Sequence, residues 1–539
     1  MTASTIASRR DESDIESGTA LKTKSIVILW CIVVAGLYFR LSGVQRNAFW
    51  EDEWWTIWRT EGSLFNTIYL LRSSPFPPLH YLLVWAWRNI WNGDIFSIRC
   101  VSLVAGIAGI ASIVTVWRKV LPAQATMWTA AVVSFSGFHM YYSLDAKMYS
   151  AVWLYSTAGG GLYLYCILKN PRSQHFFALG LVNGCAVATS YVGVISLGIQ
   201  GLFGLYLFAL RPQYRRKLAS CLFATVLSLM PLVFWIDFAL RAATHQTAGT
   251  WMPAAELQML PVDVFRLISL WLCGVWMGHG VPRDVWSWIF LVTVPVTFVF
   301  SVTLACRVAV FRRYWPNSGC SHRVLPASDE KIVLSFLVLW LCFPIFAAAV
   351  FSLTVYSLWG VPRYLIGCSP ALPILVAYAI ATDPKRGLAV GTGILILVTN
   401  GLAIQFGLTQ VIRSPMDRIS NSVRIASAAS DPKESVNVAH VSLDGRYMNP
   451  MLLQAELDRV DLPFPSKIFP VSIENMDEYD QIFVIIQSSG TGSRFKEAVK
   501  YLVQDRECVL VDRVKASEEL FSKLPGPFDC ALTEVWLCR

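Results

Sequence analysis

Charged residues are scarce in this sequence. They make up 15% of its 539 residues, while hydrophobic residues make up 55%; a soluble protein carries about 25% charged residues. This composition excludes a disordered or fibrous protein and argues against a fully soluble enzyme. Apolar runs of about twenty residues recur along most of the chain, and each is long enough to cross a hydrocarbon core of about 30 Å as a helix. The sequence therefore predicts a polytopic membrane protein.

Cysteine patterns typical of metal sites are also missing. The 13 cysteines include no CxxC pair and no Cys/His spacing of a zinc site. Most lie within apolar runs, where cysteine acts as a small hydrophobic side chain. Only Cys508, Cys530 and Cys538 stand in a polar setting in which a disulfide is conceivable. No cleavable leader is evident, since 24 mostly polar residues precede the first apolar run, which predicts a retained anchor.

The apolar runs predict eleven membrane spans. They cover residues 25–41, 96–117, 123–141, 148–168, 176–210 (two crossings with a break near Ser190), 218–240, 285–308, 332–356, 364–380 and 388–408.

Two shorter apolar segments decide the orientation. Residues 79–91 and 264–277 are too short to span comfortably and contain Arg88 and Arg266, so they are interpreted as interfacial helices. This choice puts 19 Lys and Arg residues of the membrane part inside and 11 outside, whereas a spanning 79–91 segment reverses the counts. The positive-inside rule therefore favours eleven spans with a cytoplasmic N-terminus.

Charge divides the chain into three parts. The first 408 residues carry 30 Lys and Arg against 17 Asp and Glu (+13), and the remainder carries 15 against 19 (−4). We therefore expect a cytoplasmic tail over residues 1–24, a transmembrane domain over 25–408 and a soluble extracytoplasmic domain over 409–539. Strand-like and helix-like runs alternate in the last part, which predicts a small α/β domain. The basic residues form no cluster on one face, so the sequence does not predict nucleic-acid binding.

The strongest local motif is FWEDEWWT at residues 49–56, on the predicted outer face. Its tryptophans fit the aromatic belt of a membrane interface. Asp52 and Glu53, partly shielded from water there, are candidates for a general base. An ordinary polar loop beside a membrane is the alternative interpretation.

Two further motifs lie on the predicted outer face. YYSLDAKMYS at residues 141–150 places Asp145 and Lys147 at the mouth of two spans, a pattern also typical of a boundary anchor. VPRYLIGCSPALP at residues 361–373 begins a span with Arg363 and Tyr364. A cation on the outer side usually has a partner or a ligand, and the planar fork of arginine suits a phosphate.

Together with SPFPPLHYLL at residues 74–83, these motifs resemble the GT-C membrane glycosyltransferases. The closest group is the bacterial relatives of the dolichyl-phosphate-mannose protein mannosyltransferases (glycosyltransferase family 39) and of the lipid A aminoarabinose transferase. The resemblance covers residues 25–408 in order and spacing. It implies a GT-C fold in the cell inner (plasma) membrane, and an enzyme that moves a sugar from a polyprenyl-phosphate donor to a lipid, protein or glycan acceptor outside the cytoplasm.

The resemblance also implies residue roles. Asp52 and Glu53 match the family's catalytic acidic pair. Substrate contacts fall on the family's second acidic position and its neighbours, on the late Arg-Tyr pair and near the Pro-Pro motif: Asp145, Lys147, Arg363, Tyr364 and His80. Two departures stand out, because Lys147 replaces the usual arginine and Phe76 stands where the family often has histidine. The sequence motifs indicate no organic cofactor. They do not decide whether the enzyme uses a divalent cation.

The expected reaction is a single inverting displacement. Asp52 accepts the acceptor's proton while Lys147 and Arg363 neutralise the departing lipid phosphate. A transporter or flippase of lipid-linked sugar is the main alternative, although transporters usually carry polar or broken helices near the middle of the membrane. A third interpretation is a silent scaffold whose C-terminal part does the work.

Overall fold

The computed structural model describes the chain in segments. They comprise residues 27–28, 30–42, 51–72, 76–91, 95–245, 257–274, 285–314, 327–354, 358, 362–383 and 386–406, and in the C-terminal part residues 437–442, 467–470, 482–488, 508–515 and 532–538. A few side chains within these segments, including that of Asp52, lie outside the described set.

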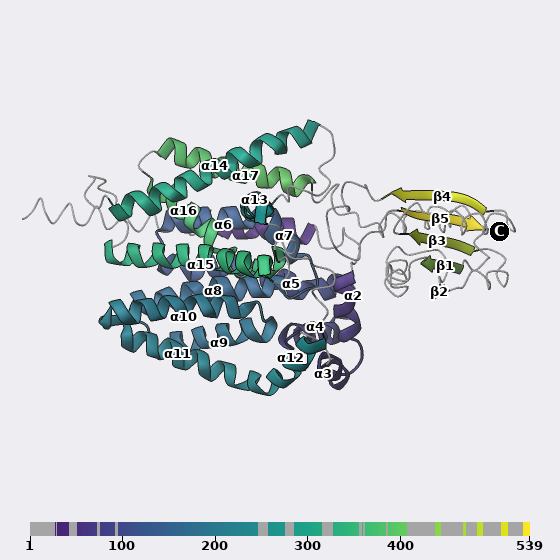
Figure 1. Ribbon diagram of the computed structural model, residues 1–539, viewed down its shortest axis with the longest axis horizontal. Helices are drawn as coiled ribbons and strands as arrows, with labels where there is room; N and C mark the ends of the chain where they lie inside the picture. Colours follow the sequence, from purple (N-terminus) through teal and green to yellow (C-terminus); the bar gives the residue numbers. More distant parts are fainter. Residues whose placement is uncertain are drawn as a thin grey trace, which may run out of the picture.

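Helices make up nearly all of the described residues before residue 407 (Figure 1). A helix over Trp30–Ser42 comes first. The labelled helices are α2 (Glu51–Arg59), α3 (Leu64–Arg72), α4 (Leu79–Ile90), α5 (Ile95–Thr115), α6 (Ala123–Ser134), α7 (Gly137–Ser143), α8 (Tyr149–Leu168), α9 (Ser173–Thr189), α10 (Gly193–Leu210), α11 (Arg215–Leu229), α12 (Val233–His245), α13 (Leu260–Cys273), α14 (Val285–Tyr314), α15 (Ala327–Thr354), α16 (Ala371–Thr382) and α17 (Arg386–Phe406). Short 3₁₀ turns include η1 (Trp117–Lys119), η2 (Pro212–Tyr214), η3 (Met230–Leu232) and η6 (Pro362–Leu365).

Six of the described helical segments are long and apolar enough to cross a membrane. They are Ser97–Lys119, Tyr149–Leu168, Gly193–Leu210, Pro212–Phe238, Ser328–Thr354 and Gly387–Ile404. Three shorter apolar helices cover Trp30–Ser42, Val292–Cys306 and Ala371–Thr382. The multi-pass character predicted from the sequence is therefore present. The predicted break near Ser190 also lies where α9 gives way to α10.

One predicted span is broken. Residues 123–141 form α6 and α7 rather than a single helix. The Ser136 hydroxyl accepts the backbone N–H of His139 at 3.5 Å, and Asn400 Oδ1 accepts the N–H of Gly137 at 3.2 Å. These side chains satisfy backbone groups that a break leaves open, as an interrupted helix within a bundle requires.

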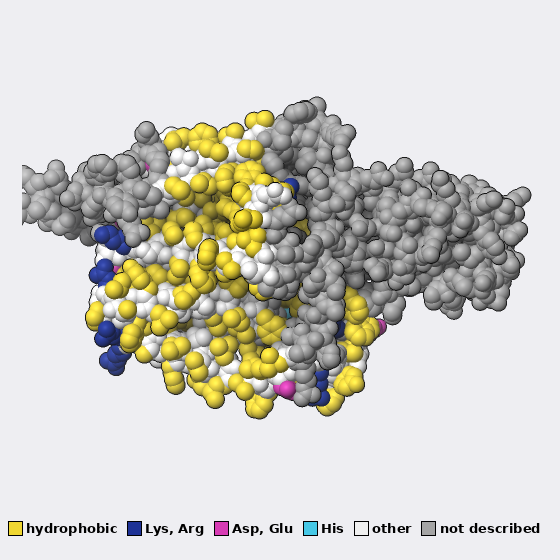
Figure 2. Space-filling view, viewed as in Figure 1, with side chains coloured by type: hydrophobic (Ala, Val, Ile, Leu, Met, Phe, Trp, Pro, Cys, Tyr) yellow, Lys and Arg dark blue, Asp and Glu magenta, His cyan; other side chains and the backbone are white. Residues whose placement is uncertain are grey.

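The two ends of the helical bundle differ. The short helices α2, α3 and α4 lie together at one end, here called the site end (Figure 1). At the opposite end, here called the basic end, lie η1, the turn between α8 and α9, and η2. Figure 2 shows Lys and Arg side chains gathered there and a broadly hydrophobic surface along the helices. Such a surface fits contact with lipid.

Aromatic side chains and small residues hold the long helices together. The indole rings of Trp117 and Trp340 are buried and stacked, with centroids 6.2 Å apart. Gly160 on α8 lets Trp340 approach so closely that an added Cβ would lie 2.7 Å from the ring. Small residues at helix contacts of this kind are typical of membrane proteins.

The C-terminal part contains a five-stranded sheet of order β2-β1-β3-β5-β4. Its strands are β1 (Asn437–Ser442), β2 (Lys467–Pro470), β3 (Ile482–Ser488), β4 (Cys508–Lys515) and β5 (Leu532–Cys538). β1 pairs in parallel with β2 and β3, and β5 pairs antiparallel with β3 and β4. Parallel pairs need crossover connections. The segments between the strands, where helix-like runs are predicted, lie outside the described residues, so the α/β domain stays a prediction.

Candidate active site

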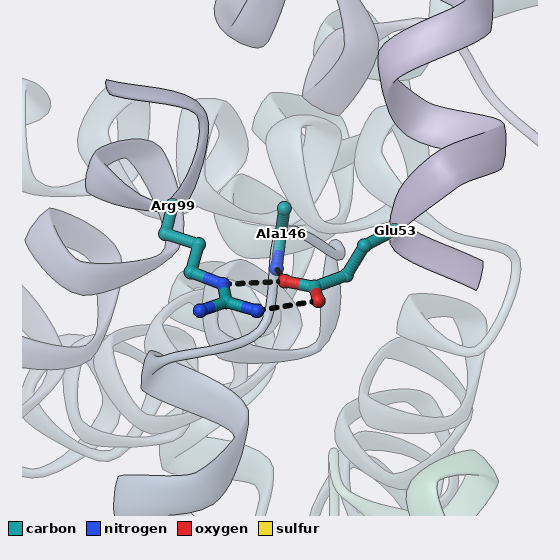
Figure 3. A network of polar contacts seen from close by, with 3 residues as sticks. All are labelled: Glu53, Arg99 and Ala146. Atoms are coloured by element: carbon teal, nitrogen blue, oxygen red, sulfur yellow. Dashed lines mark hydrogen bonds and ion pairs between the residues drawn. The ribbon is translucent and has the colours of Figure 1, made fainter. Parts of the chain in front are cut away.

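A buried ion pair organises the site end. Arg99 Nε and Nη2 each donate to the carboxylate of Glu53 at 2.7 Å, and the backbone N–H of Ala146 donates to the same carboxylate at 2.8 Å (Figure 3). The Glu53 and Arg99 side chains are 1% and 2% exposed. One carboxylate thereby joins α2, α5 and the segment between α7 and α8 that carries Asp145.

The sequence did not predict the role of Arg99. It lies inside an apolar run and was counted only as one outer charge. A signal was available, because an ionisable residue inside a membrane segment usually has a partner. The identity of that partner, 46 positions away in the chain, is a property of the fold.

The segment between α7 and α8 buries both of its charged residues. Asp145 is 4% exposed and Lys147 is 2% exposed. The Lys147 N–H donates to the Asp145 carbonyl at 2.7 Å, and the Ser102 hydroxyl donates to the Lys147 carbonyl at 2.8 Å. A tight turn, held by α5, therefore brings the acidic and the basic side chain into the site end.

A second buried arginine holds the end of α7. Arg40, from the first helix, is 0% exposed. It donates to the Ser134 carbonyl at 3.0 Å and to the Ser143 hydroxyl at 3.3 Å. Ser143 is the last residue of α7, so Arg40 fixes the backbone directly before the Asp145 segment. Sequence reasoning gave Arg40 no role.

His80 lies on α4 beside this segment and is 1% exposed. Burial, together with the smaller effect of the Lys147 charge, lowers the pKa of His80 to about 3. The imidazole is therefore neutral near pH 7. It can donate or accept a hydrogen bond there without adding positive charge to the site.

Arg363 and Tyr364 lie in η6, which follows α15 in the chain. Arg363 Cζ lies 5.7 Å from the ring centroid of Tyr149 and 5.9 Å from that of Tyr364. Tyr149 belongs to the 141–150 motif, and the Ala146 N–H of the same motif binds Glu53. The three outer motifs found in the sequence therefore meet at this segment, although more than 300 residues separate Glu53 from Arg363.

The backbone of Asp52 lies at the site end, next to Glu53. It belongs to the first turn of α2 and directly precedes Glu53. Its side chain lies outside the described residues, so its role stays a prediction.

Arg59 is a further cation that sequence reasoning missed. It ends α2, and its Cζ lies 5.2 Å from the Trp55 ring centroid and 5.7 Å from those of Phe76 and Tyr81. Lys147 Nζ approaches the same Phe76 and Tyr81 rings at 5.6 and 6.0 Å.

No group of three His, Cys, Asp or Glu residues within the described residues is placed to hold a metal ion. The divalent cation considered from the sequence therefore stays an open question for the candidate site.

The fold has counterparts among solved structures. ArnT from Cupriavidus metallidurans, crystallised with undecaprenyl phosphate, matches with a TM-score of 0.52 and 11% identity, over 96% of this chain and 98% of that one. The helical part of the chain has the GT-C fold. The archaeal oligosaccharyltransferase AglB from Archaeoglobus fulgidus, in complex with an inhibitory peptide and a dolichol phosphate, gives a TM-score of 0.45 at 10% identity, over 83% of this chain and 65% of that one. No protein-family model and no curated protein matches the sequence.

This similarity confirms the fold that the sequence motifs implied. At 11% identity it concerns architecture alone, and functional residues must be argued from the site itself.

Proposed function

We propose that this protein is an integral-membrane glycosyltransferase that moves a sugar from a polyprenyl-phosphate donor to an extracytoplasmic acceptor with inversion. The observation that carries the proposal is the convergence of Glu53, Asp145, Lys147 and Arg363 at one end of a GT-C fold. Acidic and basic groups buried together at a membrane boundary are rare and usually functional. The undecaprenyl phosphate bound to ArnT supports the same donor class.

The charge distribution supports an outward-facing site. Arg118 in η1, Lys169 in the turn after α8, and Arg211 and Arg216 on either side of η2 lie at the basic end. Figure 2 shows Lys and Arg side chains gathered at this end. The positive-inside rule puts that end in the cytoplasm. We accordingly retain eleven spans, a cytoplasmic tail over residues 1–24 and an extracytoplasmic α/β domain over residues 409–539.

The reaction needs no covalent intermediate, because a lipid phosphate is already a good leaving group. The acceptor oxygen or nitrogen attacks the anomeric carbon, and the Asp52 carboxylate takes its proton. The bond from the anomeric carbon to the phosphate oxygen breaks, and its electron pair stays on the phosphate. Lys147 and Arg363 stabilise that developing charge in a partly dry site.

Glu53 takes a positioning role in this scheme. Both of its oxygens already accept hydrogen bonds, from Arg99 and from the Ala146 backbone. It thereby sets the distance between α2, which carries Asp52, and the Asp145 segment. Asp145, Tyr364 and the neutral His80 are assigned to contact the sugar or the acceptor.

Substitution of Asp52 tests the proposal. Asp52→Asn should reduce transfer from a polyprenyl-phosphate sugar by at least ~10²-fold, the scale of a lost general base, without changing expression or thermal unfolding. Glu61→Gln, an exposed carboxylate just beyond α2, is the matched control and should transfer normally. Near-normal turnover by the Asp52 variant would remove it from the role of base.

Reconstituted vesicles separate an enzyme from the transporter alternative. Donor and acceptor are supplied only at the face that carries the site end. An enzyme forms glycosylated product there, whereas a transporter moves the lipid-linked sugar across the bilayer without changing a bond. Mass spectrometry of the lipid and acceptor fractions distinguishes the two results.

A further inference from the structure

Two cations outside the Glu53–Arg99 pair share one pair of aromatic rings. Arg59 comes from the end of α2 and Lys147 from the segment before α8. Both lie within 6.0 Å of the Tyr81 ring centroid and within 5.7 Å of the Phe76 centroid. The shared rings bring a cation from α2 and a cation from the segment before α8 to the same part of the site end.

Neither Arg59 nor Lys147 belongs to an ion pair that the described residues form with each other. An aromatic face offers a cation about 1–2 kcal/mol, whereas removing an ion from water costs several kcal/mol. Lys147 is 2% exposed, and the neighbouring His80 is neutral. An anionic ligand beside the two rings would stabilise both cations.

We propose that Arg59 and Lys147 bind the departing phosphate together, and that this pair prefers the doubly charged phosphate monoester product to the singly charged phosphodiester donor. This inference rests on the proposed function and adds to it a donor-binding residue and a charge preference. Sugar transfer converts a phosphodiester of charge −1 into a monoester of about −1.5 to −2 at pH 7. Two cations gain interaction as that charge develops, so they favour the transition state over the bound donor.

A consequence is inhibition by the product. A site matched to the leaving phosphate holds the polyprenyl phosphate after the sugar has gone. Added polyprenyl phosphate should then compete with the donor, and its release should slow turnover.

Binding of undecaprenyl phosphate to the purified full-length protein in detergent tests the site without relying on turnover. Titration by tryptophan fluorescence gives the affinity, and undecaprenol, which lacks the phosphate, reports binding of the lipid chain alone. Arg59→Gln should weaken undecaprenyl phosphate binding at least tenfold and leave undecaprenol binding unchanged. Arg59→Lys should recover part of the loss.

Arg72→Gln is the matched control. Arg72 also lies over an aromatic ring at the site end, with Cζ 5.3 Å from the Phe238 centroid, but it does not share the Phe76 and Tyr81 rings. Its substitution should leave both affinities unchanged. Equal losses in the Arg59 and Arg72 variants would show a general effect of surface charge and overturn the inference.

The pH dependence tests the preference for a dianion. The second phosphate proton has a pKa of about 6, so wild-type affinity should rise between pH 5.5 and 7.5, and the rise should flatten in Arg59→Gln. An Arg59 variant that binds like wild type, or that keeps the same pH dependence, overturns the inference. Phosphate binding without any transfer activity would instead overturn the proposed function and leave the anion site standing.

Discussion

The two ends of the helical bundle carry their lysines and arginines in opposite ways. At the site end, Arg99 and Lys147 are both 2% exposed. At the basic end, Arg118, Arg172, Arg211 and Arg216 are exposed. Exposed cations interact with water and lipid headgroups and determine orientation. Buried cations are costly unless the fold supplies partners or a ligand, so the burial of Arg99 and Lys147 marks the end where chemistry is expected.

A similar contrast exists between the two ion pairs. Glu53–Arg99 is bidentate at 2.7 Å and almost fully buried, whereas Asp263–Arg266 within α13 is 3.3 Å long and its side chains are 18% and 31% exposed. Buried bidentate geometry fixes three elements at once, while a half-buried pair within one helix adds less.

Breaking the buried ion pair should have the largest effect. Glu53→Leu leaves the Arg99 guanidinium buried without its carboxylate, and we expect a loss of about 3–5 kcal/mol in the free energy of unfolding. Chemical denaturation in detergent measures this loss. Asp263→Asn, the matched change in the half-buried pair, should cost less than about 1 kcal/mol.

The double variant Glu53→Leu/Arg99→Leu separates stability from positioning. Apolar replacement of both partners is often close to neutral, so stability should largely return. Transfer should stay lost, because the Ala146 N–H no longer has the carboxylate that anchors the Asp145 segment. Recovery of transfer in the double variant would contradict the positioning role of Glu53.

Substitution at Lys147 should affect catalysis more than stability. Lys147→Gln should lower kcat/KM for the lipid donor by roughly 10²-fold, as expected when a cation that stabilises the leaving group is lost. Lys147→Arg should keep most of the activity, since arginine keeps the positive charge and can donate to a phosphate. Steady-state kinetics with varied donor measures both. Equal losses in the two variants would point to packing rather than charge.

The buried histidine predicts a pH effect on stability. Folding lowers the pKa of His80 from 6.5 to about 3. The unfolded chain therefore binds the proton more readily, and stability falls as the pH drops from 6.5 towards 3. The loss contributed by His80 is about 2 kcal/mol at pH 5. Unfolding of wild type and His80→Gln at pH 8 and pH 5 measures it; identical losses in the two proteins would exclude His80 as the source.

Much of this arrangement follows from local sequence patterns. The apolar runs predict the helices, because the composition of each span is enough to determine it. The short motifs predict that Glu53, Asp145 and Arg363 lie at the same end. The break between α6 and α7 was missed because Asn400, which supports it, lies on a distant helix.

The cation contacts were missed for a related reason. Arg59 and Arg99 look like two ordinary outer charges in the sequence. Their functions depend on which ring or carboxylate the fold brings near, and that is set by packing between helices rather than by spacing along the chain.

The smallest effect is expected at the basic end. Arg216 is exposed and forms no ion pair within the described residues. Arg216→Gln should change the free energy of unfolding by less than ~0.5 kcal/mol, as for most surface substitutions, and leave transfer unchanged. Denaturation and the vesicle assay measure these quantities under the conditions used for Lys147→Gln. A loss of transfer as large as that of Lys147→Gln would show that exposed and buried cations contribute alike, and the distinction between the two ends would fail.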